Sequence, residues 1–276
     1  VQGGGLTATA MVACARLGLR TRYIGKFGSD QIGRVAREEL AAEGLELGAA
    51  VQATDAPNRL CFVMVEAGSG HRTIIRHRDT RIWLRPEELV REAVCAGRVL
   101  HLDGYEGDAA LQAARWARAA GIPVSVDAEE PTERREELCA AADLLIVGLR
   151  FGRALTGRTE PGAILDGLAR LGPRCVGLTL GEHGSLLAQG GRAVEAPGYP
   201  VAVVDTTGAG DVFHGAFLYG VLRGWEAGDI LRFANAVAAL KCTQLGGRAG
   251  IPRVAAVRAF LRDRGEQLPE DSARKE

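Results

Sequence analysis

The chain of 276 residues lacks an excess of either charge, because 34 basic and 34 acidic residues give a formal net charge of zero. Proteins that bind nucleic acid usually carry a basic patch or stripe, so this balance argues against that class. Apolar runs long enough to cross a bilayer, which takes roughly 20 residues, are also missing. The sequence therefore predicts neither a nucleic-acid partner nor a membrane segment.

Aromatic residues are scarce, and the cysteines lack the spacing of a metal site. Aromatic residues make up only 5% of the chain, so Ala, Val, Leu and Gly must fill most of the core. The six cysteines include no C-x-x-C pair, and most have apolar neighbours. This pattern argues against zinc and favours buried, reduced thiols in a cytoplasmic protein.

The beginning of the chain has no methionine and no signal peptide, and a glycine run at 3–5 follows Val1 almost at once. We expect that an N-terminal strand is missing from this sequence. The length of 276 residues suffices for one large α/β domain, which we expect to span residues 1–276.

Helical and strand patterns alternate through most of the chain, which predicts a doubly wound α/β sandwich with a mainly parallel sheet. Helices are expected at 6–17, 31–43, 86–95, 107–120, 131–140, 150–156, 161–171, 210–223, 226–245 and 253–264. Strands are expected at 21–25, 98–103, 123–127, 143–147 and 174–180, and near 185–188 and 192–195.

One stretch departs from this alternation. Residues 45–52, 59–66 and 71–77 read as three short strands with no helix between them. Such a series predicts a small β-sheet, set apart from the main fold within about 45–80, that could act as a lid or as an oligomer surface.

The strongest chemical signal is Asp205-Thr-Thr-Gly-Ala-Gly-Asp211, between an expected strand and an apolar helix. A glycine-rich turn that opens a helix presents backbone N–H groups at the positive end of the helix dipole, where phosphate binds. Gly208 and Gly210 let the backbone approach the anion closely. Asp211 is then placed to take a proton from a hydroxyl that attacks a phosphate. A simple turn and helix cap would explain a lone Gly-Ala-Gly, but the full string favours phosphoryl transfer.

This string resembles the second signature of the ribokinase (PfkB-type) carbohydrate kinases. Gly3-Gly-Gly5 with Thr9 and Arg16-Leu-Gly18 is similar to the first signature, Gly25 to Gly33 to the G-x-x-G-x-D-x-x-G segment, and Thr179 to Gly184 to the nucleotide-side turn. The resemblance covers nearly the whole chain. The segment from Phe233 to Pro252 is similar to bacterial kinases of fructose-type sugars, including sulfofructose kinases.

The resemblance implies a role for each matched residue. It implies that Asp211 is the base, that Gly208, Ala209 and Gly210 form an anion hole, and that Mg²⁺ bridges the phosphates of ATP. The sugar would be contacted by Gly4, Gly5, Thr9 and Asp103 as well as Asp211. The nucleotide would be bound by Thr179, Gly181, Gly184, Thr207, Gly208, Gly210, Asn235 and Ala238. A monovalent cation, usually potassium in this family, could lie near Asp205, Thr207 and Gly247.

The chain also departs from the family pattern. Thr9 stands where the family often has Asn, and Gly148 and Phe151 stand where it often has the Asn and Glu that organise Mg²⁺. The family's first strand normally supplies an Asp that contacts the sugar, and it would precede Val1.

Several other polar residues permit two interpretations. A basic set on the expected lid strands either captures an anionic group of the substrate or is a solvated or dimer-facing surface, and the second interpretation is preferred. Its members are Arg59, Arg72, Arg76, His77 and Arg78. His101, His183 and His214 are expected to be structural. The pair Glu129-Glu130 follows the expected strand 123–127 near the nucleotide edge, but Asp127 is the better candidate for a site contact, as much as for a structural role.

The sequence thus predicts an ATP-dependent kinase acting on a carbohydrate hydroxyl, expected to be a primary one on a ketose or related sugar. A nucleoside kinase of the same family and a non-catalytic sugar- or nucleotide-binding relative remain alternatives. A homodimer formed through the lid is a further expectation.

Overall fold

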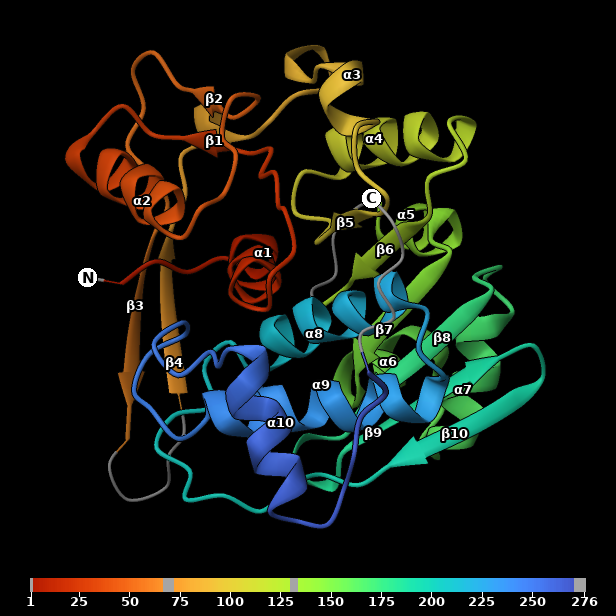
Figure 1. Ribbon diagram of the computed structural model, residues 1–276. Helices are drawn as coiled ribbons and strands as arrows, with labels where there is room; N and C mark the ends of the chain where they lie inside the picture. The colour runs from red at the N-terminus through yellow and green to blue at the C-terminus, as the bar shows by residue number, and fades with distance from the viewer. Residues whose placement is uncertain (1, 67–71, 130–133, 271–276) are drawn as a thin grey trace.

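A six-stranded sheet in the order β10-β9-β8-β7-β6-β5 forms the centre of the computed structural model, which describes residues 2–66, 72–129 and 134–270 (Figure 1). Its strands are β5 (Leu100–Leu102), β6 (Val124–Asp127), β7 (Leu144–Gly148), β8 (Cys175–Thr179), β9 (Ser185–Gln189) and β10 (Arg192–Ala196). Strands β5 to β8 are parallel, and β9 and β10 are antiparallel to their neighbours. The expected mainly parallel sheet is therefore confirmed.

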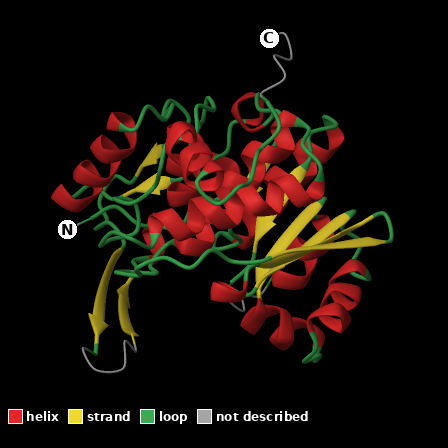
Figure 2. Cartoon of the chain, turned by 60° about the horizontal axis from the view of Figure 1, so that its bottom comes forward, coloured by secondary structure: helices red, strands yellow, loops and turns green. Residues whose placement is uncertain are grey.

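Helices cover both faces of this sheet (Figure 2). The first face packs against α1 (Leu6–Arg16), α8 (Ala209–Arg223), α9 (Ala227–Lys241) and α10 (Val254–Arg262). The second packs against α4 (Gly107–Ala119), α5 (Arg135–Ala141), α6 (Leu149–Thr156) and α7 (Pro161–Ala169). Strand β7 shows why two layers form. Leu144 and Ile146 belong to the first core, whereas Leu145 and Val147 belong to the second, because alternate residues of a strand point to opposite faces.

The region before residue 86 differs in detail from the expectation. Instead of one three-stranded sheet there are two separate pairs: β1 (Lys26–Phe27) runs parallel to β2 (Val51–Gln52), and β3 (Leu60–Val65) forms an antiparallel hairpin with β4 (Arg72–His77). The expected strand at 21–25 is wrong, since this stretch contributes only a single bridge between Arg22 and Glu46. The strand expected directly before Asp205 is also wrong, because residues 197–205 form no strand. Helix α2 (Gln31–Ala42) packs on β1.

The predicted helix 86–95 is also wrong as a single element. The structure has a 3₁₀ turn at Pro86–Glu88 followed by the four-residue helix α3 (Arg91–Val94). Another 3₁₀ turn lies at Thr80–Ile82 and a third at Gly181–His183. In the described part of the chain, no helix is long and apolar enough to cross a membrane.

The parallel strands fix the place of a site. Their carboxyl ends share one edge of the sheet, and in doubly wound folds ligands bind at that edge. Asp103 follows β5, while Asp127, Gly148 and Thr179 end β6, β7 and β8. Gly148 pairs directly with Thr179. Residues that are far apart in the sequence are thereby brought to one edge.

Candidate active site

The glycine turn before α8 has the geometry of an anion site. Gly208 is the residue before the helix and has φ 76°, a left-handed conformation that favours glycine. A Cβ added there would lie 2.9 Å from the carbonyl oxygen of Gly247. The Ala209 N–H donates to the carbonyl of Thr206 (3.1 Å) and closes the turn. The N–H groups that follow belong to the first helical turn, where an α-helix supplies them with no partner of its own.

Asp205 holds the other end of this turn in place. Its carboxylate accepts hydrogen bonds from the backbone N–H groups of Thr207 and Gly246, both at 2.8 Å. Burial raises the pKa of Asp205, but these hydrogen bonds and the charge of Lys241 together outweigh it and lower the pKa below its ordinary value. The residue therefore stays ionised, and it ties the 205–208 turn to the loop that carries Gly247.

Asp211 lies in the first turn of α8, half-buried, among other carboxylates. Oxygens of Asp127, Glu129 and Asp211 all lie within 4.8 Å of one another. Burial and then the charges of Asp127, Glu129 and Asp103 raise the pKa of Asp211 well above its ordinary value. A carboxylate with a raised pKa is a stronger base, which suits proton abstraction near neutral pH.

Glu129 is a site residue that sequence reasoning ranked below Asp127. Its Oε1 is 3.5 Å from where a Cβ of Gly210 would lie, so a carboxylate stands beside the anion turn. With Asp127 it supplies oxygen donors of the kind that Mg²⁺ prefers. Gly148 and Phe151 supply none: glycine has no side chain, and Phe151 is buried in the core beneath α6.

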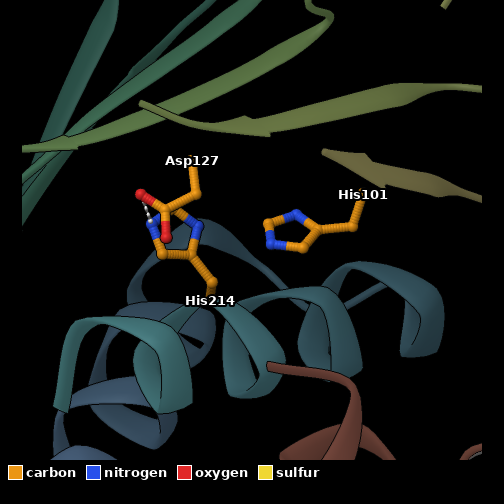
Figure 3. A group of neighbouring side chains, drawn as sticks. All are labelled: His101, Asp127 and His214. Carbon is orange, nitrogen blue, oxygen red and sulfur yellow. Dashed lines mark ion pairs between the residues drawn. The ribbon is translucent and has the colours of Figure 1, made fainter. Parts of the chain in front are cut away.

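Below this cluster, His101, Asp127 and His214 point toward one another from β5, β6 and α8 (Figure 3). His214 Nε2 lies 3.2 Å from Asp127 Oδ1, and His101 Nδ1 lies 3.1 Å from the hydroxyl of Ser125. All three side chains are buried, which lowers the pKa of His214 to about 4 and of His101 to about 3, and raises that of Asp127 to about 8. Burial thus favours the neutral forms of this polar group.

The expectations for His101 and His214 agree with these positions, whereas that for His183 stays a prediction. His101 and His214 are packed between the sheet and α8 and do not open onto the surface, as expected for structural residues. His183 is exposed, and 78% of its side chain is accessible. Asp127 combines both interpretations, because its Oδ1 lies 3.2 Å from His214 Nε2 and its carboxyl group also lies within 4.8 Å of those of Glu129 and Asp211.

The expected sugar residues reach the same place because α1 packs tightly on α8. A Cβ on Gly215 would lie 2.5 Å from the carbonyl of Ala10, so glycine permits this approach. The side chain of Asp103 accepts hydrogen bonds from the N–H groups of Thr7 (3.4 Å) and Tyr105 (3.1 Å). Asp103 is thereby held at the amino end of α1, beside Gly4 and Gly5.

Arg248 is a site residue that the sequence analysis did not single out. Its guanidinium donates to the carbonyl of Gly4 (2.7 Å) and to the hydroxyl of Thr9 (3.3 Å). It also lies 3.9 Å from Glu39, and its charge lowers the pKa of Asp211. In the sequence, only its place directly after Gly246-Gly247 could have marked Arg248 as a site residue.

The lid arginines are engaged inside the protein. Arg59 and Arg78 both donate to the carboxylate of Glu106, Arg78 at 2.8 Å. The Arg78 guanidinium also stacks on Trp83 (4.7 Å to the ring centre) and Tyr105 (5.4 Å). Arg59 and Arg78 therefore fit neither interpretation as stated, because both guanidinium groups pair with Glu106 within the chain. His77 and Arg76 are exposed on β4, and the side chain of Arg72 lies outside the described part of the structure.

A groove of about 740 Å³ lies where the nucleotide residues were expected. Its lining includes Thr179, Gly181 and Gly148, together with Arg150 and Arg153. The second glycine of the Thr179–Gly184 motif, Gly184, has φ 97°, and a Cβ there would clash with the Ala196 carbonyl, so only glycine fits.

Asn235 and Ala238 lie on α9, and the amide of Asn235 is used inside the protein. It accepts from the hydroxyl of Ser185 (3.0 Å) and donates to the carbonyls of Ala196 (3.0 Å) and Pro197 (3.1 Å). These hydrogen bonds connect α9 to β9 and to the end of β10. The expected contact of Asn235 with adenine stays a prediction.

Comparison with known proteins agrees with this geometry. Residues 1–253 match the model of the pfkB family of carbohydrate kinases. The chain is 30% identical to the ATP-dependent ribose-1-phosphate kinase of Halopiger xanaduensis over 266 residues, which covers 95% of this chain and 87% of the relative. The chain therefore belongs to the pfkB carbohydrate kinase family, whose members transfer phosphate from ATP.

Solved structures of the same fold are similar over nearly the whole chain. A putative ribokinase from Agrobacterium tumefaciens superposes with a TM-score of 0.89 at 26% identity, covering 96% of this chain and 87% of that one. A putative ribokinase II from E. coli, in complex with ATP and Mg²⁺, gives 0.84 at 23% identity, covering 94% and 89%. The predicted ribokinase-like fold is confirmed.

Proposed function

We propose that this protein transfers the γ-phosphate of ATP to a hydroxyl of a carbohydrate, with Asp211 as the base. The observation that carries the proposal is the position of Asp211, a carboxylate with a raised pKa in the first turn of the helix that the glycine turn opens. A hydroxyl that loses its proton to Asp211 would attack a phosphate seated on the backbone at Gly208–Gly210. The charge that develops on the phosphoryl oxygens would be stabilised by the helix N-terminus.

ATP and Mg²⁺ are the proposed cofactors. When bound, Mg²⁺ neutralises the phosphate oxygens. Asp127 and Glu129 are the residues that we propose to hold it, because their carboxylates lie beside the anion turn while Gly148 and Phe151 cannot coordinate a metal. Buried Asp127 Oδ2 has no hydrogen-bond partner among the described residues, so it has a lone pair to offer.

The acceptor would enter between the amino end of α1 and Asp211. Gly4 and Gly5 would present backbone groups to the sugar, and Asp103 would accept from its hydroxyls. Thr9 is buried and its hydroxyl accepts from Arg248, so it would act on the sugar only through that arginine. Arg248 already joins Gly4 to Thr9, so it positions this side of the pocket. We propose a ketose or related sugar as substrate, with a primary hydroxyl as the acceptor. A phosphorylated or acidic sugar deserves inclusion because the Halopiger relative is named for a sugar phosphate.

The test is ADP release from ATP and Mg²⁺ over a panel of ketoses, aldoses, sugar phosphates, sugar acids and nucleosides. Stimulation of at least tenfold by one carbohydrate, with the phosphorylated sugar identified by mass spectrometry, would support the proposal. A protein that binds ATP but releases no ADP with any acceptor would instead be a non-catalytic relative.

A nucleoside acceptor is the second candidate. The observation in its favour is the pair of aromatic rings on the lid side, Trp83 and Tyr105, since a base could stack on one of them. Both rings are in contact with the guanidinium of Arg78, which would have to move or sandwich the base. Nucleoside-specific ADP release that Trp83→Ala abolishes would favour this candidate over a sugar.

A homodimer through the lid is proposed on the exposure of the β3–β4 hairpin, which projects from the body of the protein (Figures 1 and 2). Phe62 pairs with Ile75 and Val63 with Ile74, and all four side chains are at least 45% accessible. A two-stranded hairpin is marginal alone, and exposed apolar clusters mark contacts. Light scattering should give twice the chain mass, and Phe62→Glu should return the monomer.

A further inference from the structure

A buried lysine lies directly behind the anion turn. Lys241 ends helix α9, and its side chain has 0% of its surface accessible. Its Nζ donates to the carbonyl oxygen of Asp205 at 2.8 Å. Burying an ammonium group costs free energy unless oxygen atoms accept its hydrogen bonds. The surroundings of Lys241 must therefore stabilise a positive charge.

Backbone hydrogen bonds hold the end of α9, next to Lys241, in place. The carbonyl of Cys242 accepts from the N–H groups of Val204 (2.8 Å) and Asp205 (3.1 Å), which fastens the end of α9 to the chain that enters the turn. A Cβ on Gly250 would lie 2.3 Å from the carbonyl of Lys241, so the returning loop passes close as well. The backbone at the end of α9 is thus held between the entry to the turn and the loop that carries Gly247, and Nζ reaches from there to the Asp205 carbonyl.

This is the place where the family resemblance puts a monovalent cation, near Asp205, Thr207 and Gly247. A potassium ion must contact several carbonyl oxygens, and the Asp205 oxygen already receives a proton donor from Lys241. A potassium ion about 4 Å from this ammonium would also be repelled by it. At the effective dielectric of a protein, that repulsion would weaken potassium binding roughly a thousandfold. The residues present therefore do not fit a bound potassium ion.

We infer that the ammonium group of Lys241 takes the place of the monovalent cation, so that phosphoryl transfer by this protein needs no potassium. An ammonium group carries the same single charge, and here it donates a hydrogen bond to the Asp205 carbonyl, beside the place where a potassium ion would bind. Because it is tethered, it is present at every potassium concentration. Lys241 is a positioning residue in this scheme: it acts through the Asp205 carbonyl on the turn and touches no reacting atom.

A simpler role is to stabilise the end of α9, where a cation favours the helix dipole. Arg118 provides a control for that role. It lies in the last turn of α4, far along the chain from the anion turn, and donates to the carbonyl of Ala141 at 3.4 Å. If a basic side chain only stabilises a helix end, the variant that lacks it should have the same turnover in every salt.

The inference rests on the proposed role of the 208–210 turn, and the experiment separates the two. Turnover and melting temperature are measured in potassium, ammonium and tetramethylammonium chloride at equal ionic strength, for wild type, Lys241→Ala and Arg118→Ala. Wild type and Arg118→Ala should show turnover within about twofold in all three salts, and no potassium-specific rise in melting temperature. In tetramethylammonium, the turnover of Lys241→Ala should be at least tenfold below that of wild type. Potassium or ammonium should restore much of this turnover and should also raise the melting temperature of the variant.

Potassium stimulation of wild type by fivefold or more would overturn the inference, as would a potassium-specific rise in its melting temperature. A folded Lys241→Ala that responds to no small cation in either measurement would overturn it too. If Lys241→Ala does not fold, the wild-type measurements alone decide. Absence of acceptor-dependent ADP release in every salt would instead count against the proposed function, and the melting temperatures would still report on the cation site.

Discussion

Replacing Asp211 by Asn should affect catalysis and stability in opposite directions. The change removes the proposed base and keeps the size of the side chain. Loss of general-base catalysis costs about a hundredfold or more in kcat, which corresponds to about 2.7 kcal/mol of transition-state stabilisation. ATP should bind nearly as before, because the backbone at 208–210 is unchanged.

Stability should rise in the same variant, since Asp211 is held among carboxylates that raise its pKa. Burial disfavours its ionised form most strongly, and its carboxyl neighbours Asp127, Glu129 and Asp103 add to this effect. An Asn cannot ionise, so the variant escapes this repulsion near neutral pH. Relieving one unfavourable buried charge commonly adds about 0.5–2 kcal/mol, so we expect a melting temperature higher than that of wild type by a few degrees.

The assay pairs ADP release with thermal unfolding and ATP titration on the same preparations. Asp103→Asn is the matched comparison. The carboxylate of Asp103 accepts hydrogen bonds from backbone N–H groups on the side where the acceptor would bind. We therefore expect a higher KM for the acceptor and a smaller loss in kcat than for Asp211→Asn. The reasoning would be refuted by Asp211→Asn turnover within tenfold of wild type. A melting temperature below wild type would show that Asp211 contributes a stabilising interaction that outweighs the repulsion.

Three further predictions follow from single contacts. Gly208→Ala should lose at least tenfold in turnover and about 1–3 kcal/mol in stability, since φ 76° and a Cβ 2.9 Å from the Gly247 carbonyl both oppose it; unchanged unfolding would contradict this. Arg248→Lys should raise the KM for the acceptor about tenfold and leave that for ATP unchanged, because one ammonium cannot span Gly4 and Thr9; equal changes in both would argue against it. Asp127→Asn should gain stability over wild type as pH rises from about 4 to about 8. Burial raises the pKa of Asp127 to about 8, so the folded wild type keeps a proton that the unfolded chain has lost. That stabilisation disappears across this window, by up to about 1.4 kcal/mol per pH unit. Thermal unfolding at several pH values measures it, and a constant difference would mean that Asp127 stays ionised beside a protonated His214.

The sequence by itself determined the fold class, the anion turn and the identity of the proposed base. These are local or periodic properties. Gly208 can adopt the left-handed conformation that the turn uses because it has no Cβ, and alternating strands and helices leave few arrangements other than a covered parallel sheet. The same local signals were misleading before residue 86, where a run of strand formers did not indicate which strand pairs with which.

Only the tertiary structure decided how the rest of the site is assembled. Arg248 and Glu129 join it through contacts with Gly4 and Gly210, across 244 and 81 positions of the chain, and no local pattern encodes such pairings. Lys241 reads in the sequence as an ordinary basic residue at a helix end. Its burial against the Asp205 carbonyl depends on how α9 packs beside the turn, and packing brings the charge to a place that sequence spacing could not reveal.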